Sequence, residues 1–267
     1  MKRMTNDDVR KIEVNILSYV KSICKKNNLT YYLYAGTLVG AVLYGDFLPE
    51  DDDIDIILPR KDYDKLLSIL DKSNKYKLFS PYNNKDYYYS FAKLSDKHTL
   101  LIEKSRVKIE NLGVHIDIFP MDGIPNHFKK IYLFKMRIIK KLLLTKLVDK
   151  PKITKLRHYK YLIKYYIMML IEKINKNKDN NYLALLIDKK AKKYDYDSSK
   201  YVSLVTYGSR NSNYIKKDDF SLQDVYYFNN DYYTGSKNSE VLLEKIYGKK
   251  NNTKKHHISH GFVAFFK

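Results

Sequence analysis

The apolar positions near the start of the chain follow the spacing of a helix. Thr5 and Asp8 are placed as in a capping box, and the apolar residues after them recur every three or four positions. The pattern predicts an amphipathic helix that ends near residues 25–28. Cys24 falls on its apolar face, where a cysteine is expected to be a buried and unreactive thiol.

A strand, a glycine turn and a short helix are predicted next. Residues 31–34 form an apolar, aromatic run, and Gly36-Thr37 separates this run from a small and apolar segment at 38–44. We expect Thr37 to be the N-cap of the short helix and Gly45 to end it. A turn of this kind exposes backbone amides, a hydroxyl and a helix N-terminus, which together suit a phosphate group.

Later segments repeat the alternation of strands and helices. Residues 54–58 and 114–119 have the composition and alternation of strands, and Pro59 suits the first turn of a helix after the former. Residues 87–101 are aromatic and β-branched enough for a hairpin. These patterns together predict an α/β body.

The middle of the chain has a different character. Residues 126–193 interleave Lys and Arg with Leu, Ile, Tyr and Met and contain no glycine, which predicts two or three basic amphipathic helices. We expect a catalytic core at 1–125, a basic helical insertion at 126–200, and a C-terminal part at 201–267 that completes the same domain as the core.

Composition restricts the class of protein. The 267 residues are 44% hydrophobic and 30% charged, which is typical of a globular protein and not of a disordered one. A single cysteine excludes an internal disulfide and a zinc site built on several thiolates. The longest apolar stretches fall far short of the roughly 20 residues that a membrane span needs. Because residues 1–13 are too polar for a signal peptide, a cytoplasmic location is expected.

The formal net charge of +20 is concentrated in the insertion. Residues 126–200 hold 21 Lys and Arg against 6 Asp and Glu, whereas residues 1–125 hold 19 against 18. Basic helices rich in Leu and Phe at 126–173 fit an anionic membrane surface. They fit equally well a lysine-coated subdomain that packs on the body. Nucleic acid is not expected as a partner, because no recognisable reader motif accompanies the charge.

The densest acidic cluster lies in the near-neutral half, at residues 50–55. Side chains alternate along a strand, so Asp53 and Asp55 face the same way, roughly 6.6 Å apart at about 3.3 Å per residue. Two carboxylates at that spacing can bind one Mg²⁺, or Mn²⁺, beside substrate phosphates. A solvated acidic loop is the plainer interpretation of the same run.

Asp117 is the natural third carboxylate. It lies in the apolar run 114–119, with His115 on its own face and apolar residues on the other. A carboxylate so close to core positions is costly unless it is paired or binds a metal. Asp53, Asp55 and Asp117 are therefore the candidate metal ligands and catalytic residues.

The order of these motifs is that of the nucleotidyltransferase superfamily, whose mixed sheet is flanked by helices. The acidic block Asp51-Asp52-Asp53-Ile54-Asp55 and its neighbourhood resemble the signature of the LicD family. The resemblance extends over nearly the whole chain and is weak from 126 to 230. The matching blocks are residues 24–30, 36–42, 47–56, 59–63, 92–99, 115–122, 243–248 and 260–265.

The resemblance implies transfer of a phospho-alcohol, such as phosphocholine, from a CDP-linked donor such as CDP-choline to a sugar hydroxyl. The acceptor would be a cell-surface glycan, such as lipopolysaccharide or teichoic acid, or its lipid-linked precursor, modified from the cytoplasmic side of the membrane. Asp53 and Asp55 would hold Mg²⁺ on the donor diphosphate, and Asp117 would complete the metal site or accept the proton of the acceptor hydroxyl. The residues that would contact substrate are Gly36, Thr37, Lys93 and His260.

Two departures from the family pattern concern the acceptor and the donor head group. The family has a tryptophan before the acidic run, whereas Glu50 follows Pro49 here, and the Gly-Asp of a later block is Gly248-Lys249. Two other functions remain open. One is a nucleotidyltransferase that leaves a nucleoside monophosphate on its acceptor, and the other is a non-catalytic basic module that binds membranes.

Overall fold

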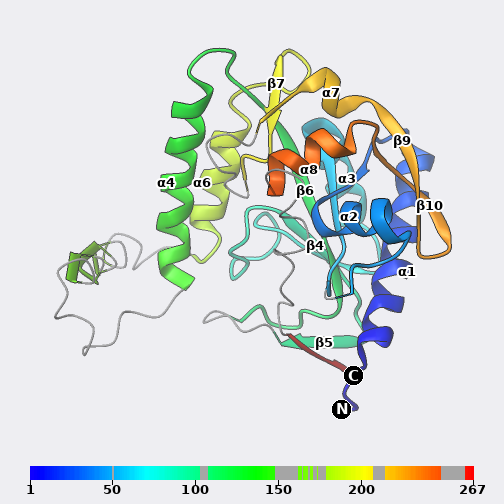
Figure 1. Ribbon diagram of the computed structural model, residues 1–267. Helices are drawn as coiled ribbons and strands as arrows, with labels where there is room; N and C mark the ends of the chain where they lie inside the picture. Colours follow the sequence, from blue (N-terminus) through cyan, green and yellow to red (C-terminus); the bar gives the residue numbers. More distant parts are fainter. Residues whose placement is uncertain are drawn as a thin grey trace.

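Helices and strands alternate over residues 6–79, and three further strands follow before the next helix (Figure 1). This computed structural model describes residues 1–49, 51–102, 108–147, 179–206, 214–247 and 262–267, with 162–163, 165–167, 169–170 and 173, and no side chains for 142–147. Helix α1 (Asn6–Asn27) has the predicted capping box between Thr5 and Asp8. As expected, Cys24 is buried on its apolar face, and burial raises the pKa of this thiol to about 12.

The central sheet has β6 (His115–Ile124) in the middle, and every residue of this strand is buried. The strand order is β1-β2-β6-β4-β3, from β1 (Tyr32–Leu33) and β2 (Asp55–Pro59) to β4 (Ala92–Ser95) and β3 (Lys77–Phe79). Among the strands described, β2 and β6 alone run parallel, and the other pairs of this sheet are antiparallel. The mixed sheet and its flanking helices confirm the predicted α/β class.

The C-terminal part of the chain joins the same sheet. The end of β6 pairs with β7 (Tyr201–Ser203), and β7 pairs with β8 (Ile215–Lys216). A separate hairpin is formed by β9 (Gln223–Phe228) and β10 (Asp231–Ser236). The remaining helices of this region and of the core are α2 (Ala35–Tyr44), α3 (Arg60–Leu70), α7 (Lys217–Ser221) and α8 (Ser239–Tyr247).

Two local predictions are wrong. Residues 87–101 do not form a hairpin, because β4 lies in the central sheet while β5 (Thr99–Ile102) pairs with β11 (Val263–Phe266). Thr37 is not an N-cap, because α2 begins at Ala35 with Tyr34 as its cap. The first error arises because alternation along a strand does not specify the partner strand. The second arises because the turn closes earlier, with Ala35 in the left-handed region at a φ of 45°.

Helices α4 (Lys129–Leu147) and α6 (Tyr182–Ala191) pack side by side at one edge of the molecule (Figure 1). These are two of the two or three basic helices predicted for the insertion. An apolar cluster, separate from the main core around the central sheet, lies between these helices and the end of β6. It comprises Ile124, Leu133, Met136, Leu183, Ile187, Ala191 and Val205.

A buried arginine ties this helical pair to the sheet. Arg60 Nε donates to Asp122 Oδ1 of β6 at 2.6 Å, and Arg60 Nη1 donates to Asp188 Oδ1 of α6 at 2.8 Å. The boundaries predicted at 125/126 and 200/201 stay predictions. In the part of the chain described, no helix has the length and apolar character needed to cross a membrane.

Candidate functional site

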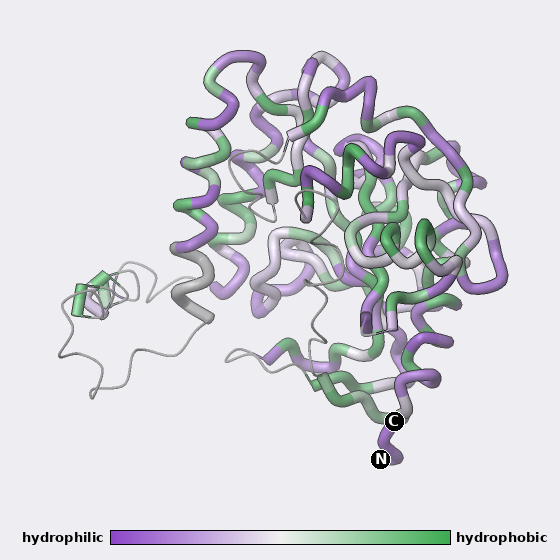
Figure 2. The backbone as a smooth tube through the Cα atoms, in the orientation of Figure 1, coloured by the Kyte–Doolittle hydropathy of each residue, from purple (hydrophilic) through white to green (hydrophobic). Residues whose placement is uncertain are grey.

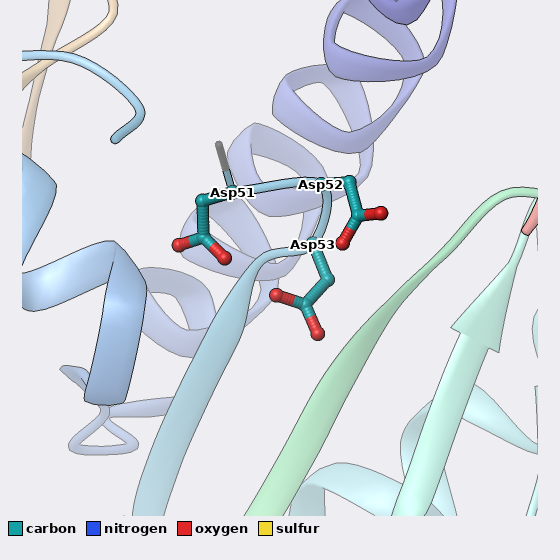
Figure 3. Close-up of side chains that lie close together, drawn as sticks. All are labelled: Asp51, Asp52 and Asp53. Atoms are coloured by element: carbon teal, nitrogen blue, oxygen red, sulfur yellow. The ribbon is translucent and has the colours of Figure 1, made fainter. Parts of the chain in front are cut away.

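Three consecutive aspartates lie on the turn that leads into β2, with α1 behind them (Figure 3). The backbone N–H of Asp51 donates to the carbonyl of Leu48 at 3.1 Å. Gly36, at the start of α2, makes room for the Asp51 carboxylate: a Cβ at position 36 would lie 2.2 Å from Asp51 Oδ2. Any larger residue at position 36 would therefore displace this carboxylate.

Asp55, Asp117 and Lys93 form one row across three adjacent strands. Asp55 of β2 is the register partner of Asp117 in β6, and Lys93 of β4 is the register partner of Asp117 on the other side. Lys93 Nζ donates to Asp117 Oδ1 at 2.8 Å and lies 2.8 Å from His115 Nε2. Lys93 and Asp117 are 4% and 8% exposed, so this ion pair lies largely out of solvent.

The candidate metal ligands converge. Carboxylate oxygens of Asp53, Asp55 and Asp117 all lie within 4.8 Å of one another, and so do oxygens of Asp51, Asp52 and Asp53. Carboxylate oxygens are the donors that Mg²⁺ and Mn²⁺ prefer. Crowded carboxylates at the end of a buried strand repel one another unless a cation lies among them. The residues present therefore fit a divalent cation.

The electrostatic environment of this row opposes further negative charge. Burial and the carboxylates of Asp53 and Asp117 raise the pKa of Asp55 well above its usual range, and Lys93 acts in the opposite direction. Tyr247, at the end of α8, also lies in this field: burial first, then Asp55 and Asp51, raise its pKa. The C-terminal part of the chain therefore reaches the acidic site.

Glu13 is a site residue that the sequence reasoning missed. This α1 side chain is 1% exposed, and its Oε2 has no hydrogen-bond partner among the described residues. Its pKa is raised well above the usual range, by burial and then by Asp53, Asp52 and Asp51. The available signal was a glutamate on the apolar face of a predicted amphipathic helix, where an unpaired charge is costly.

Arg10, one turn earlier on α1, was also missed. Its Nη2 donates to the backbone carbonyls of Leu48, Pro49 and Asp51 at 3.0, 3.2 and 2.9 Å. The guanidinium carbon lies 4.9 Å from the ring centroid of Phe47. One side chain thus fixes the backbone of the turn that carries the aspartates, and no local pattern reveals that contact.

Three of the four residues expected to contact substrate lie next to the candidate metal ligands, and the fourth is not described. Thr37 is 2% exposed, and its Oγ1 accepts the backbone N–H of Asp55 at 2.8 Å, so it anchors the start of β2. Gly36 lies against Asp51, and Lys93 lies inside the acidic row. His260 lies outside the described residues, as does the Gly248-Lys249 departure.

The α/β fold, with aspartates on its parallel strand pair and a glycine turn beside them, is consistent with a nucleotidyltransferase domain. Comparison with protein families agrees: residues 28–146 match the family described as "LicD/FKTN/FKRP, nucleotidyltransferase domain". Over these residues the comparison supports the LicD-type domain that the sequence motifs predict.

Two curated relatives overlap this region. The chain is 30% identical over 136 residues to "Lipopolysaccharide cholinephosphotransferase LicD" of Haemophilus influenzae, a match that covers 49% of this chain and 50% of that protein. It is 29% identical over 103 residues to an uncharacterized protein of Rickettsia prowazekii, covering 39% of this chain and 36% of that protein. The chain thus spans about half the length, or less, of these curated relatives.

Proposed function

We propose that this protein is a phosphotransferase that moves a phospho-alcohol, phosphocholine or a similar group, from a CDP-linked donor to a sugar hydroxyl. The acceptor is a cell-surface glycan such as lipopolysaccharide, or its lipid-linked precursor, and the reaction takes place on the cytoplasmic side of the membrane. The convergence of Asp53, Asp55 and Asp117 within a LicD-type domain carries the proposal. The name of the Haemophilus influenzae relative supports the choice of donor group and acceptor.

Asp53, Asp55 and Asp117 would hold Mg²⁺, or Mn²⁺, against the donor diphosphate. A divalent cation there supplies charge stabilisation at the reacting phosphorus and on the leaving nucleoside monophosphate. Lys93 holds the Asp117 carboxylate in a fixed orientation through their 2.8 Å contact. Thr37 fixes the backbone of Asp55, and Arg10 fixes that of Asp51, so the acidic groups are oriented before substrate arrives.

Loss of single carboxylates tests the proposed site. The variants Asp53→Asn, Asp55→Asn and Asp117→Asn should each lower transfer at least about 100-fold, the scale seen when one transition-state contact is removed. Asp224→Asn is the matched control, because that aspartate is exposed on β9. Circular dichroism and melting temperature report whether each variant is folded. Full transfer activity in a folded Asp53→Asn or Asp55→Asn variant would overturn the mechanism.

The family description also supports a second function, nucleotidyl transfer, in which the nucleoside monophosphate stays on the acceptor. CDP-choline labelled in the choline half or in the cytidine half separates the two reactions when incubated with a surface-glycan extract and Mg²⁺. The proposed reaction transfers the choline label and releases CMP. Transfer of the cytidine label supports the second function instead. If neither label moves and CDP-choline with Mg²⁺ fails to raise the melting temperature, this choice of donor is wrong.

A further inference from the structure

Helix α4 presents apolar side chains to solvent. Leu133 and Met136, on its inner side, are 2% and 3% exposed and belong to the apolar cluster beneath the helix. On its outer side Ile131, Phe134 and Ile138 are 53%, 51% and 43% exposed. Three and four residues separate them, so they line one side of the helix. Green segments alternate with purple ones along α4 in Figure 2.

Basic side chains flank these apolar ones. The exposed residues Lys130, Lys135, Arg137 and Lys141 lie among them, and the sequence of α4 contains no aspartate or glutamate. We call these seven residues the α4 outer face. They are Lys130, Ile131, Phe134, Lys135, Arg137, Ile138 and Lys141.

A short helical stretch further along the insertion has the same character. Its described residues include large apolar side chains that are 39% to 64% exposed, and most are spaced three or four positions apart as on one side of a helix. They are Leu162, Ile163, Tyr166, Ile167, Met169 and Leu170. Exposed apolar groups within the most basic segment of the chain thus recur at a second place.

The combination of charge and apolar side chains selects among the possible occupants of the α4 outer face. A second copy would bring an equally basic helix against this one, and like charges repel. Nucleic acid would satisfy the lysines and leave Ile131, Phe134 and Ile138 without apolar cover. An anionic bilayer provides both negative charge and apolar cover, because its headgroups attract Lys and Arg while its acyl boundary accepts Ile and Phe.

We propose that the α4 outer face binds the surface of an anionic lipid bilayer, with α4 lying parallel to that surface. Phe134 and its neighbours enter the acyl boundary, and the four basic residues contact phosphate headgroups. This binding is independent of the proposed transfer reaction, because no residue of the α4 outer face belongs to the acidic site. It would hold the protein where lipid-linked glycans are present.

Co-sedimentation of the full chain with vesicles tests this inference. Binding is expected to phosphatidylcholine vesicles that also contain phosphatidylglycerol, and not to phosphatidylcholine alone. Replacing Lys130, Lys135, Arg137 and Lys141 with Gln should lower the partition coefficient at least about 10-fold. The matched control replaces Lys25, Lys26, Lys65 and Lys72 with Gln, which makes the same charge change on exposed positions of α1, of α3 and of the turn after α3.

A second variant tests the apolar contribution. Ile131→Ser, Phe134→Ser and Ile138→Ser combined should remove the binding that persists at high salt, where the electrostatic part is screened. The inference is overturned if wild type ignores anionic vesicles, or if the control quartet loses as much binding as the α4 quartet. Self-association that the serine variant abolishes, without vesicle binding, also overturns it in favour of a second copy. Transfer to a detergent-dispersed glycan, measured on the same variants, should stay unchanged, so failure of either proposal is recognised separately.

Discussion

Asp55 of β2 and Asp117 of β6 are direct register partners in the parallel strand pair at the centre of the sheet. The backbone N–H of Asp117 donates to the carbonyl of Ile54 at 2.8 Å, which locks this register next to the two carboxylates. Residues 62 positions apart in the sequence therefore present their acidic groups at one end of the sheet. The ladder fixes their separation, so the site is formed before any ligand arrives.

Lys93 should stabilise the fold through Asp117. Lys93→Met leaves a buried carboxylate without its ammonium partner, and we expect the free energy of unfolding to fall by about 3–5 kcal/mol. Adding Asp117→Asn removes the uncompensated charge and should restore part of that loss. Urea unfolding followed by circular dichroism measures both, with Lys77→Met, at an exposed position of β3, as the control. A double variant as unstable as Lys93→Met would contradict this account.

Arg10 should act on the site more than on overall stability. Arg10→Gln releases three backbone carbonyls of the acidic turn, so cation affinity should fall by about 10-fold, as when an outer-shell contact is lost. Lys11→Gln, at the neighbouring exposed position, is the control. Titration calorimetry with Mn²⁺ measures the affinity without substrate. Equal affinities for the two variants would exclude a positioning role for Arg10.

Glu13 should make stability depend on pH. Its pKa is raised in the folded state, so the folded chain keeps a proton that the unfolded chain loses above about pH 4.3. The free energy of unfolding therefore falls as pH rises through this window. Glu13→Gln lacks the effect and should gain stability relative to wild type between about pH 5 and about pH 8. Melting temperatures measured in EDTA check this, and parallel pH curves would refute it.

Arg60 should contribute more to the free energy of unfolding at neutral pH than at about pH 5. It compensates Asp122 and Asp188, and burial, outweighing Arg60, raises the pKa of Asp122 to about 6. Arg60→Met should cost about 3–5 kcal/mol of unfolding free energy above that pKa, and less at about pH 5, where Asp122 is mostly protonated.

The partly exposed partner of Arg60 provides the control for this prediction. Asp64 Oδ1 lies 3.5 Å from Arg60 Nη1, and its side chain is 43% exposed. Asp64→Asn should therefore change the free energy of unfolding by less than about 1 kcal/mol. Urea unfolding at both pH values measures the two variants. A cost of Arg60→Met that does not change with pH would show that Asp122 stays ionised throughout.

The sequence by itself determines the features of this protein that depend on residues close together in the chain. The capping box and apolar spacing of α1 depend on residues three or four positions apart, and strand alternation places Asp117 and His115 on one side of β6. The acidic block and glycine turn identify the LicD-type domain, because they are contiguous motifs. The basic character of the insertion is likewise a property of composition.

Only the tertiary structure decided which of these groups meet. β5 pairs with β11, and Lys93 pairs with Asp117, although these segments lie far apart in the chain. The alternation of apolar and polar residues along a strand does not specify which strand it pairs with. The packing of α1 decides that Glu13 is buried beneath the acidic turn. It also decides that Arg10 donates hydrogen bonds to the backbone carbonyls of Leu48, Pro49 and Asp51. Packing of α4 against α6 likewise decides which side of α4 is buried. It leaves Ile131, Phe134 and Ile138 exposed.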